Sequence, residues 1–398
     1  MNRTRILILA VFAALLVVAP AQAASPVALG AGSAPWLVVD PAGTGHMVFR
    51  STPDDGIVYC RLPRGKRACD VRTALPIGKH AETYKLLRRA DGVLIALQTD
   101  DDEDGAPLSR QGGRLWASFS SDNGATFSPP AILASGIDES FAGILSPDGQ
   151  AVLLLQLQGN QALLRRAPFA GPDPRVLDID DTGQTPSAAK LATFPDGRML
   201  LIHSSLEDTT GWRVFNGGDP LDVNAWPTHG VLDGVRGAQL VTGPRGVFLL
   251  HRNGSNGQKL LDLPPASIRS FDTKRLRWRA ARGALADEQI FAQSDLSEDA
   301  NGRLHIVASN ADYGGLGCVM YARTSTKSSS WFGRTTILYF TRSKSRMPSG
   351  AAAVAAADGR GFATWTDASG RAWAIPLKQA KGKYHPIRKG PNRPTCGR

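Results

Sequence analysis

The sequence predicts an all-β fold, a seven-bladed β-propeller built from four-stranded antiparallel blades. Three observations support this prediction: a repeat of about 50 residues, a hairpin-type turn in each copy, and strand-like apolar runs on both sides of that turn. The turn glycines lie 48 to 57 residues apart and are Gly43, Gly92, Gly149, Gly197, Gly246, Gly302 and Gly359. Such a period is typical of propeller blades.

Each repeat begins with a predicted β-hairpin. Asp91-Gly92 and Asn301-Gly302 are dipeptides that favour the positive φ angles of tight hairpin turns. A third strand-like run follows, for example at residues 114–120, and most copies contain a shorter fourth run. The Ala-rich segment 349–357 is expected to be an innermost strand, because it offers fewer than three helical turns between its flanking Pro and Gly residues.

The first segment of the chain predicts export. Residues 1–23 contain Arg3 and Arg5, an apolar run from Ile6 to Ala19 and an Ala-x-Ala site ending at Ala23, which is the pattern of a cleaved signal peptide. The apolar run is shorter than the roughly 20 residues of a membrane-spanning helix. We therefore expect a secreted or periplasmic protein without a membrane span. Residues 24–390 are expected to form one propeller domain and residues 391–398 a C-terminal tail.

The formal net charge is +11, from 46 Lys and Arg against 35 Asp and Glu. No basic run is dense enough to indicate a nucleic-acid partner. The loops expected on one face are acidic, and the basic residues gather in peripheral turns and in the C-terminal tail. The sequence therefore predicts an acidic ligand face on a basic protein, which we expect to be a monomer.

A short motif in the second repeat connects the chain to a known superfamily. Residues 120–127, SSDNGATF, match the Asp-box pattern S-x-D-x-G-x-T-[WF] through Ser120, Asp122, Gly124, Thr126 and Phe127. Degenerate copies occur at 270–278 and 324–331. These residues resemble the sialidase superfamily, whose propellers carry Asp-boxes, also called BNR repeats. The motif is expected to be a structural hairpin turn in which Ser and Asp bind backbone amides.

The resemblance implies an alternative architecture and a range of functions. Sialidases usually have six blades, so a six-bladed propeller is the alternative fold. Members of the superfamily include exo-sialidases, other glycan-active enzymes and propellers that only bind. A sialidase site needs three arginines around a carboxylate, a Tyr activated by a Glu, and an Asp. Arg236 and Arg346 lie near innermost strands and Tyr84 and Tyr313 on expected loops, but the third arginine and the Tyr–Glu pair are not recognisable.

We therefore favour a non-catalytic module that binds a glycan, a peptide or another envelope component. The alternative is a divergent glycoside hydrolase of the exo-sialidase type, or a lyase, that uses loop carboxylates. The candidates for those carboxylates are Asp54, Asp55, Asp102, Glu139 and Glu207. A further alternative is a protein-interaction scaffold in the envelope, whose basic rim meets anionic polymers.

The segment TDDDEDG, residues 99–105, is the densest acidic cluster. Asp100, Asp102 and Asp104 are the candidate oxygen ligands for calcium, the only cofactor considered. The segment lacks the spacing of an EF-hand loop, so a solvated acidic loop is the preferred interpretation.

Four cysteines suggest two disulfides in an exported protein. Cys60 and Cys69 flank a short turn and are expected to lie on adjacent strands, where they can pair. Cys318 and Cys396 remain, and their pairing would attach the C-terminal tail to the sixth repeat.

Overall fold

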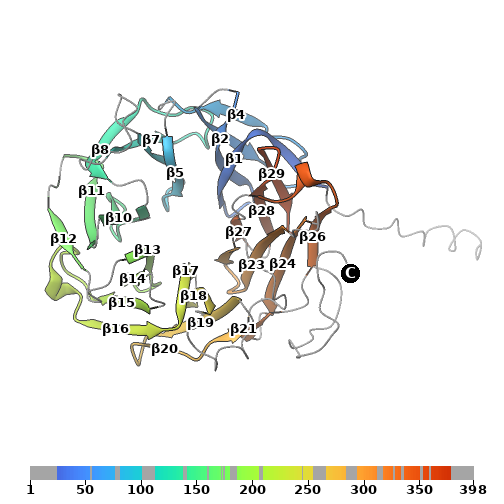
Figure 1. Cartoon of the computed structure of the whole chain (residues 1–398). Coiled ribbons are helices and arrows are strands. Elements are labelled where there is room, and N and C mark those ends of the chain that lie inside the picture. Colours follow the sequence, from blue (N-terminus) through green and yellow to red (C-terminus); the bar gives the residue numbers. More distant parts are fainter. Residues whose placement is uncertain are drawn as a thin grey trace, which may run out of the picture.

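The computed structural model shows an all-β ring of antiparallel sheets arranged around a central axis, with the innermost strands turned toward the axis (Figure 1). The structure describes residues 25–53, 56–76, 81–100, 113–137, 141–158, 161–171, 173, 175–179, 186–205, 209–243, 245–253, 266–283, 294–311, 317–325, 328–332, 336–349, 353–357 and 360–377. The prediction of a β-propeller is confirmed.

Five separate sheets have the four-strand antiparallel path expected of a blade. Their strands are β5 (Ala81–Arg88), β6 (Leu94–Asp100), β7 (Gly113–Ser120) and β8 (Ala131–Ile137); β9 (Phe141–Leu145), β10 (Ala151–Gln158), β11 (Gln161–Pro168) and β12 (Val176–Asp178); β13 (Pro186–Thr193), β14 (Met199–Ser205), β15 (Thr209–Phe215) and β16 (Thr228–Asp233); β17 (Val235–Gly243), β18 (Gly246–Asn253), β19 (Ala266–Asp272) and β20 (Arg277–Trp278), with β21 (Arg282–Gly283) also on β19; and β22 (Ser294–Glu298), β23 (Leu304–Ala311), β24 (Gly317–Ser325) and β25 (Ser328–Phe332), with β26 (Thr336–Thr341) also on β24.

The remaining strands form one continuous seven-stranded sheet, in the order β27-β28-β29-β1-β2-β3-β4. Their bounds are β1 (Val27–Val39), β2 (Gly45–Ser51), β3 (Gly56–Leu62), β4 (Val71–Ala74), β27 (Ala353–Ala357), β28 (Arg360–Thr366) and β29 (Arg371–Pro376). The prediction of seven separate four-stranded blades is therefore wrong, and so is the six-bladed alternative. Five four-strand blades are present, because hydrogen bonding fuses the first and last repeats of the chain into a single sheet.

Strand β1 causes this fusion. It is 13 residues long, and its first part, Val27 to Ala31, pairs with β29. Its second part, Gly32 to Val39, pairs with β2 and has a register shift between Ser33 and Trp36. The two ends of the described chain are thus joined edge to edge, which closes the ring.

The hairpins follow from the turn residues recognised in the sequence. In the β5–β6 turn Gly92 has φ 94°, which glycine adopts without a Cβ clash, and its amide donates to the Arg89 carbonyl at 3.1 Å. Within the Ala-rich segment 349–357, Ala353–Ala357 form strand β27, as predicted, and residues 350–352 lie outside the described residues.

Helical structure in the described residues is restricted to short 3-10 turns, namely η1 (Val223–Ala225) and η3 (Lys344–Arg346). Among those residues no helix has the length and apolar character needed to cross a membrane.

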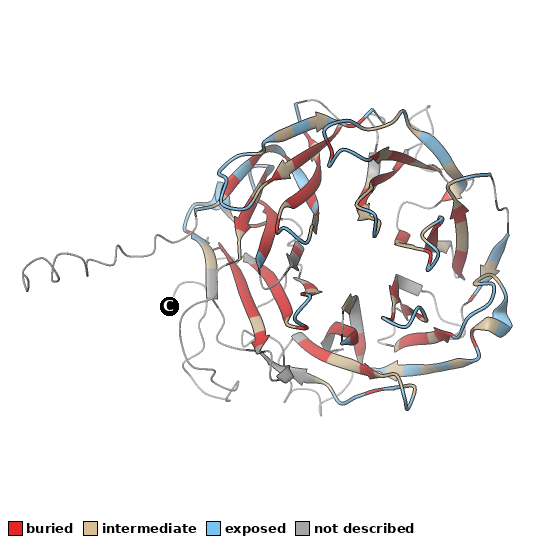
Figure 2. Ribbon diagram, turned by 180° about the vertical axis from the view of Figure 1, so that it is seen from behind, coloured by how far each residue is buried: buried red, intermediate tan, exposed pale blue. Residues whose placement is uncertain are grey.

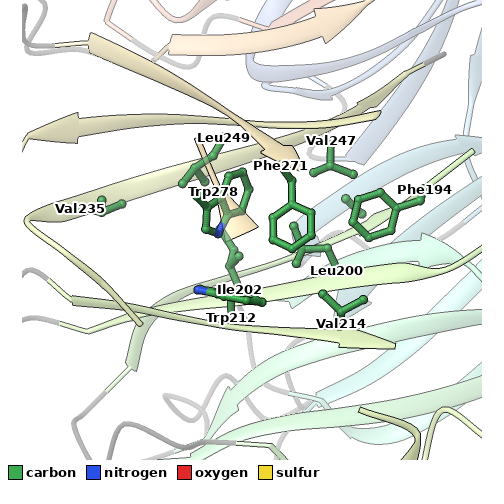
Figure 3. Packing of buried hydrophobic residues seen from close by; sticks show 11 residues of the cluster. Phe194, Leu200, Ile202, Trp212, Val214, Val235, Val247, Leu249, Phe271 and Trp278 are labelled. Atoms are coloured by element: carbon green, nitrogen blue, oxygen red, sulfur yellow. The ribbon is translucent and has the colours of Figure 1, made fainter. Parts of the chain in front are cut away.

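The core lies between neighbouring sheets. Buried residues occupy the inner and middle strands, and exposed residues gather on the outermost strands and in the turns (Figure 2). Between the β13–β16 and β17–β20 sheets, Phe194, Trp212, Phe271 and Trp278 pack with aliphatic residues from β14 and β18 (Figure 3). The Phe271 ring contacts Trp212 and Trp278 edge-on, with centroids 5.4 and 5.1 Å away. Aromatic contacts of this kind add to the energy of burial.

The segment 120–127 forms a hydrogen-bonded turn between β7 and β8. The Ser120 hydroxyl accepts from the Gly124 amide at 2.8 Å, and the Asp122 carboxylate accepts from the Thr126 amide at 3.0 Å and from its hydroxyl at 2.6 Å. These bonds hold the pKa of Asp122 at about 2. Phe127 meets the Tyr59 ring of β3 edge-on, so the turn also joins the β5–β8 sheet to its neighbour.

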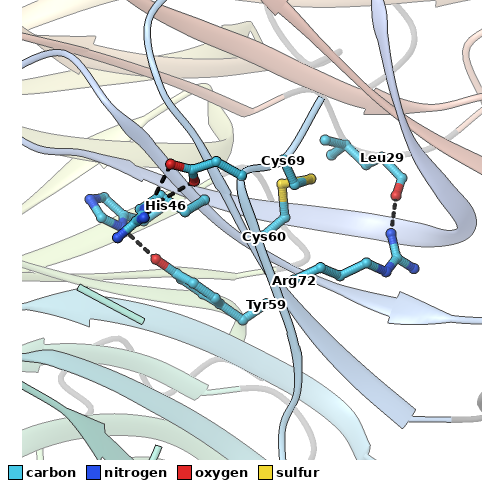
Figure 4. The surroundings of a disulfide bond; sticks show 8 residues. Leu29, His46, Tyr59, Cys60, Cys69 and Arg72 are labelled. Atoms are coloured by element: carbon cyan, nitrogen blue, oxygen red, sulfur yellow. Dashed lines mark hydrogen bonds and ion pairs between the residues drawn. A yellow bond between two sulfur atoms is a disulfide. The ribbon is translucent and has the colours of Figure 1, made fainter. Parts of the chain in front are cut away.

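Cys60 on β3 and Cys69 form the predicted disulfide (Figure 4). Close by, the Arg72 guanidinium donates to the Leu29 carbonyl of β1. Cys318 on β24 is also disulfide-bonded, and its predicted partner Cys396 lies outside the described residues.

Replacement of Gly124 by Ala tests the packing of this turn. A Cβ at Gly124 would lie 2.0 Å from the Tyr59 ring, and the residue has φ 83°. Gly65 is the matched control, with φ 78° and no atom within 4 Å of its Cβ position. Because both variants bear the same backbone strain, Gly124→Ala should lower the free energy of unfolding by about 1–3 kcal/mol more than Gly65→Ala, measured in urea. Equal losses would mean that the contact with Tyr59 does not constrain the turn.

Candidate functional site

The innermost strands contact one another in cyclic order around the axis: β1, β5, β9, β13, β17, β22 and β27, which returns to β1. In each hairpin we count residue pairs outward from the turn between the inner strand and its partner. The fourth pair contains Trp36 on β1, Lys85 on β5, Lys190 on β13 and Asp295 on β22. Ala142, Leu240 and Val354 hold the same place on the other inner strands. We call these residues the axial layer.

The charged residues of the axial layer do not share the side of the strand that carries Leu86, Leu191 and Leu296, and Lys85 and Asp295 contact the next inner strand. Their next neighbours along the strands, Leu86, Leu191 and Leu296, are buried in hydrophobic clusters. Since side chains alternate along a strand, Lys85, Lys190 and Asp295 lie on the opposite side.

Several axial-layer residues bind the backbone of the next inner strand. The Trp36 indole nitrogen donates to the Leu86 carbonyl at 3.1 Å, and the Lys85 ammonium donates to the Phe141 carbonyl. Asp295 accepts from the Val354 amide at 2.9 Å. The layer thus connects neighbouring sheets around the axis.

Lys85 is buried, and two aromatic rings surround its ammonium group. Its Nζ lies 5.4 Å from the centroid of Trp36 and 4.6 Å from that of Phe141. Burial lowers the pKa of Lys85 well below its usual value, and the nearby charge of Lys190 lowers it further. The Lys85 ammonium group is therefore already bound by the Phe141 carbonyl and by the two aromatic rings.

Lys190 and Asp295 differ from Lys85, because solvent still reaches both of them; they are half-buried. Burial lowers the pKa of Lys190, and Asp295 opposes that change. Burial also raises the pKa of Asp295 to about 6, against the effects of its backbone hydrogen bonds and of Lys190. Within the part of the chain that the structure describes, these opposite charges interact electrostatically but form no ion pair.

Trp36 is the third residue of the candidate site. It is unusually exposed for an aromatic residue on an innermost strand. Its relative exposure is 39%, whereas the aromatic residues in the sheet interiors are almost fully buried. An aromatic face, an ammonium and a carboxylate at one level around an axis are suited to recognising a polar ligand.

Two buried Asp–His–Tyr networks resemble catalytic triads, but they are structural. His46 lies 2.7 Å from the Tyr59 hydroxyl (Figure 4) and 3.4 Å from Asp40. The Tyr59 hydroxyl donates to the Asn123 carbonyl in the turn of the neighbouring sheet. In the β22–β25 sheet His305 lies 2.8 Å from Tyr321 and 3.0 Å from Asp299. Both histidines are buried. The same network in two sheets indicates that it stabilises the middle strands.

A cavity of about 380 Å³ lies beside the hairpin turns of the β9–β12 and β13–β16 sheets. Its lining includes Asp148, Arg166, Asp196 and Arg198. Arg166 lies 3.5 Å from Asp148, and Arg198 lies 2.7 Å from Asp196. These charges are already paired with one another, so the axial layer is the better candidate site.

Most of the site residues predicted from the sequence lie outside the described residues. These are Asp54, Asp55, Asp102, Asp104, Glu139, Glu207 and Tyr313. Asp100 ends β6, and its side chain is not described. The calcium site therefore stays a prediction.

The other predicted residues lie apart. Arg236 is in β17, opposite Arg252 of β18, and Arg346 is exposed in η3. The expectation that Tyr84 lies on a loop is wrong, because Tyr84 is in β5 and its hydroxyl donates to the Ser33 carbonyl at 2.6 Å. Burial raises the pKa of Tyr84 to about 12, which disfavours a nucleophilic phenolate.

Sequence reasoning missed the axial layer, although the repeat contained a signal for it. Trp36, Lys85, Lys190 and Asp295 each stand seven residues before the turn glycine of their repeat. Comparison of the repeats at this offset would have found a charged or aromatic residue in four of the seven.

No family model matches the chain, and no curated protein matches it by sequence. Several solved structures resemble it. Hydrazine synthase of Kuenenia stuttgartiensis is 11% identical, with a TM-score of 0.53 over 88% of this chain and 96% of that one. A puromycin-hydrolyzing peptidase of Mycobacterium tuberculosis is 13% identical, with a TM-score of 0.51 over 89% and 56%. A Hadza microbial sialidase is 14% identical, with a TM-score of 0.48 over 83% and 73%. At these identities the similarity is one of fold alone.

A second unusual carboxyl group, Glu298, ends strand β22. Its side chain is buried, and one oxygen accepts from the Arg245 amide at 3.3 Å. Among the described residues the other oxygen has no hydrogen-bond partner. Burial raises the pKa of Glu298 to about 7 from 4.5, and the charge of Asp299 adds to this effect.

Glu298→Gln should change how stability depends on pH. A raised pKa favours the protonated carboxyl in the folded state, so wild-type stability falls as pH rises from 4.5 to about 7. The free energy of unfolding, measured in urea, should fall by up to about 3 kcal/mol across that range because of Glu298. The Glu298→Gln variant should lack this contribution to the pH dependence. Asp196→Asn, at an exposed turn, is the control and should keep the wild-type slope in that range. An unchanged slope in Glu298→Gln would contradict the assignment.

Proposed function

We propose that the protein is an exported β-propeller that binds a glycan or another cell-envelope component on its axis, without catalysing a reaction on it. The observation that carries this proposal is the axial layer, where Lys190 and Asp295 stand at the same level as an exposed Trp36 and form no ion pair in the described residues. Burial of a charged group without an ion partner has a cost in stability, so the presence of these two half-buried charges favours a role in binding.

The chemistry of the layer is suited to recognition. Trp36 offers an apolar face to a ligand ring or chain, Lys190 offers a cation and Asp295 a hydrogen-bond acceptor. Lys85 and the backbone contacts hold the surrounding strands in place. Preorganised groups of this kind bind a ligand with little loss of conformational entropy.

Two features support export. The first is the predicted signal segment at residues 1–23, and the second is the Cys60–Cys69 disulfide, a bond that persists in oxidising compartments.

The test is binding to a glycan array and to solubilised cell-wall fragments, together with turnover of a fluorogenic sialoside. Trp36→Ala, Lys190→Gln and Asp295→Asn should each weaken binding of the ligand by about tenfold or more, because each removes a direct contact. The matched controls, Ile132→Ala, Lys274→Gln and Asp196→Asn, change exposed residues away from the axis and should bind as the wild type does.

Circular dichroism must first show that every variant is folded. Binding that all three axial variants retain would contradict the axial site. Sialoside turnover would contradict the non-catalytic role, and binding only to other proteins would favour the envelope scaffold.

A further inference from the structure

The charges of the axial layer follow a definite order around the axis. From β13 the inner strands continue to β17, β22, β27 and β1, so Asp295 stands between Lys190 on one side and Trp36 on the other. On the two intervening strands the layer positions are Leu240 on β17 and Val354 on β27, and both side chains pack in the hydrophobic clusters between sheets. Within this layer no other described charge comes between Lys190 and Asp295.

Each of these two charges keeps unused binding capacity. Asp295 accepts from the Val354 amide, and a carboxylate can accept further hydrogen bonds. Lys190 has neither a hydrogen bond nor an ion pair in the described part of the chain, while the neighbouring Lys85 is held by the Phe141 carbonyl. Lys190 is therefore the cation available to a ligand.

Trp36 can add to the recognition of a ligand. Its ring already has the Lys85 ammonium 5.4 Å from its centroid, and its exposure of 39% leaves further ring surface open to solvent. A ligand on the axis can pack against this open ring surface.

We propose that the axial layer binds a small zwitterion, a free amino acid or a short peptide, with its carboxylate at Lys190 and its ammonium at Asp295. This inference rests on the proposed function, because it assumes that the ligand occupies the axis. An anionic sugar would pair with Lys190 alone and would leave Asp295 with neutral hydroxyl donors. Charge-assisted hydrogen bonds are roughly twice as strong as neutral ones, so the zwitterion fits both residues better.

The test is calorimetric titration of the wild-type protein with alanine, dialanine and trialanine at neutral pH. The most tightly bound of the three is then compared with its N-acetylated form, which lacks the cation, and with its C-terminal amide, which lacks the anion. We expect each blocked form to bind about tenfold more weakly or worse. Galacturonic acid, an anion without an amine, should bind more weakly than the unblocked peptide.

Two variants identify which residue binds which charged group of the ligand. The Asp295→Asn variant should bind the N-acetylated and unblocked forms equally well but should still bind the C-terminal amide more weakly. The Lys190→Gln variant should bind the amide and unblocked forms equally well but should still bind the N-acetylated form more weakly. Lys274→Gln is the control and should discriminate as the wild type does. A general loss of structure would weaken all the ligands together and could not produce this crossed pattern.

Equal binding of the blocked and unblocked forms, or preferential binding of galacturonic acid, would overturn the inference. If none of the peptides binds while a glycan binds in a manner sensitive to Lys190→Gln, this inference fails and the proposed function stands. If neither peptides nor glycans nor cell-wall fragments bind, both fail.

Discussion

The hydrogen bonds that β1 makes on its two edges hold the ring closed. Its first part pairs with β29 near the end of the described chain, and its second part pairs with β2. The other sheets meet their neighbours mainly through side chains, whereas among the described residues β1 pairs its backbone with a segment at the other end of the chain. Further bonds support it, from the Gly32 amide to the Gly370 carbonyl at 2.6 Å and from the Thr364 hydroxyl to the Pro35 carbonyl at 3.3 Å.

Closure of the ring also determines the axial layer. Trp36 lies in the same strand that closes the ring, and its indole donates to Leu86 of the next inner strand. Asp295 accepts from Val354 on β27, a strand of the sheet that β1 completes. The hydrogen bonds of Trp36 and Asp295 therefore depend on segments from both ends of the described chain. Half-buried charges without ion partners lower stability, and a rigid closed ring can tolerate that cost.

Local chemistry made much of the fold predictable. The Asp-Gly turns identified the hairpins, the repeat period identified the propeller, and the short spacing between Cys60 and Cys69 identified a disulfide. The fusion of the end repeats was not predictable, because a strand that changes partner halfway along has no distinct local pattern. The sequence of residues 27–39 predicts one strand, whichever strands pair with it.

The axial layer was missed for a different reason. Acidic loops and enzyme motifs carry the recognisable signals for a site in this sequence, whereas Lys85, Lys190 and Asp295 are charged residues on three separate strands. Each alone resembles an ordinary exposed strand residue. Only the ring brings them to one level, and only burial around the axis changes their pKa values.

A crystal structure of the protein with its ligand bound tests the central claim most directly. We expect the ligand on the axis, within hydrogen-bonding distance of Lys190 and Asp295 and against the Trp36 ring. A ligand held elsewhere, for example in the cavity lined by Asp148, Arg166 and Arg198, with the axial residues untouched, would contradict the account.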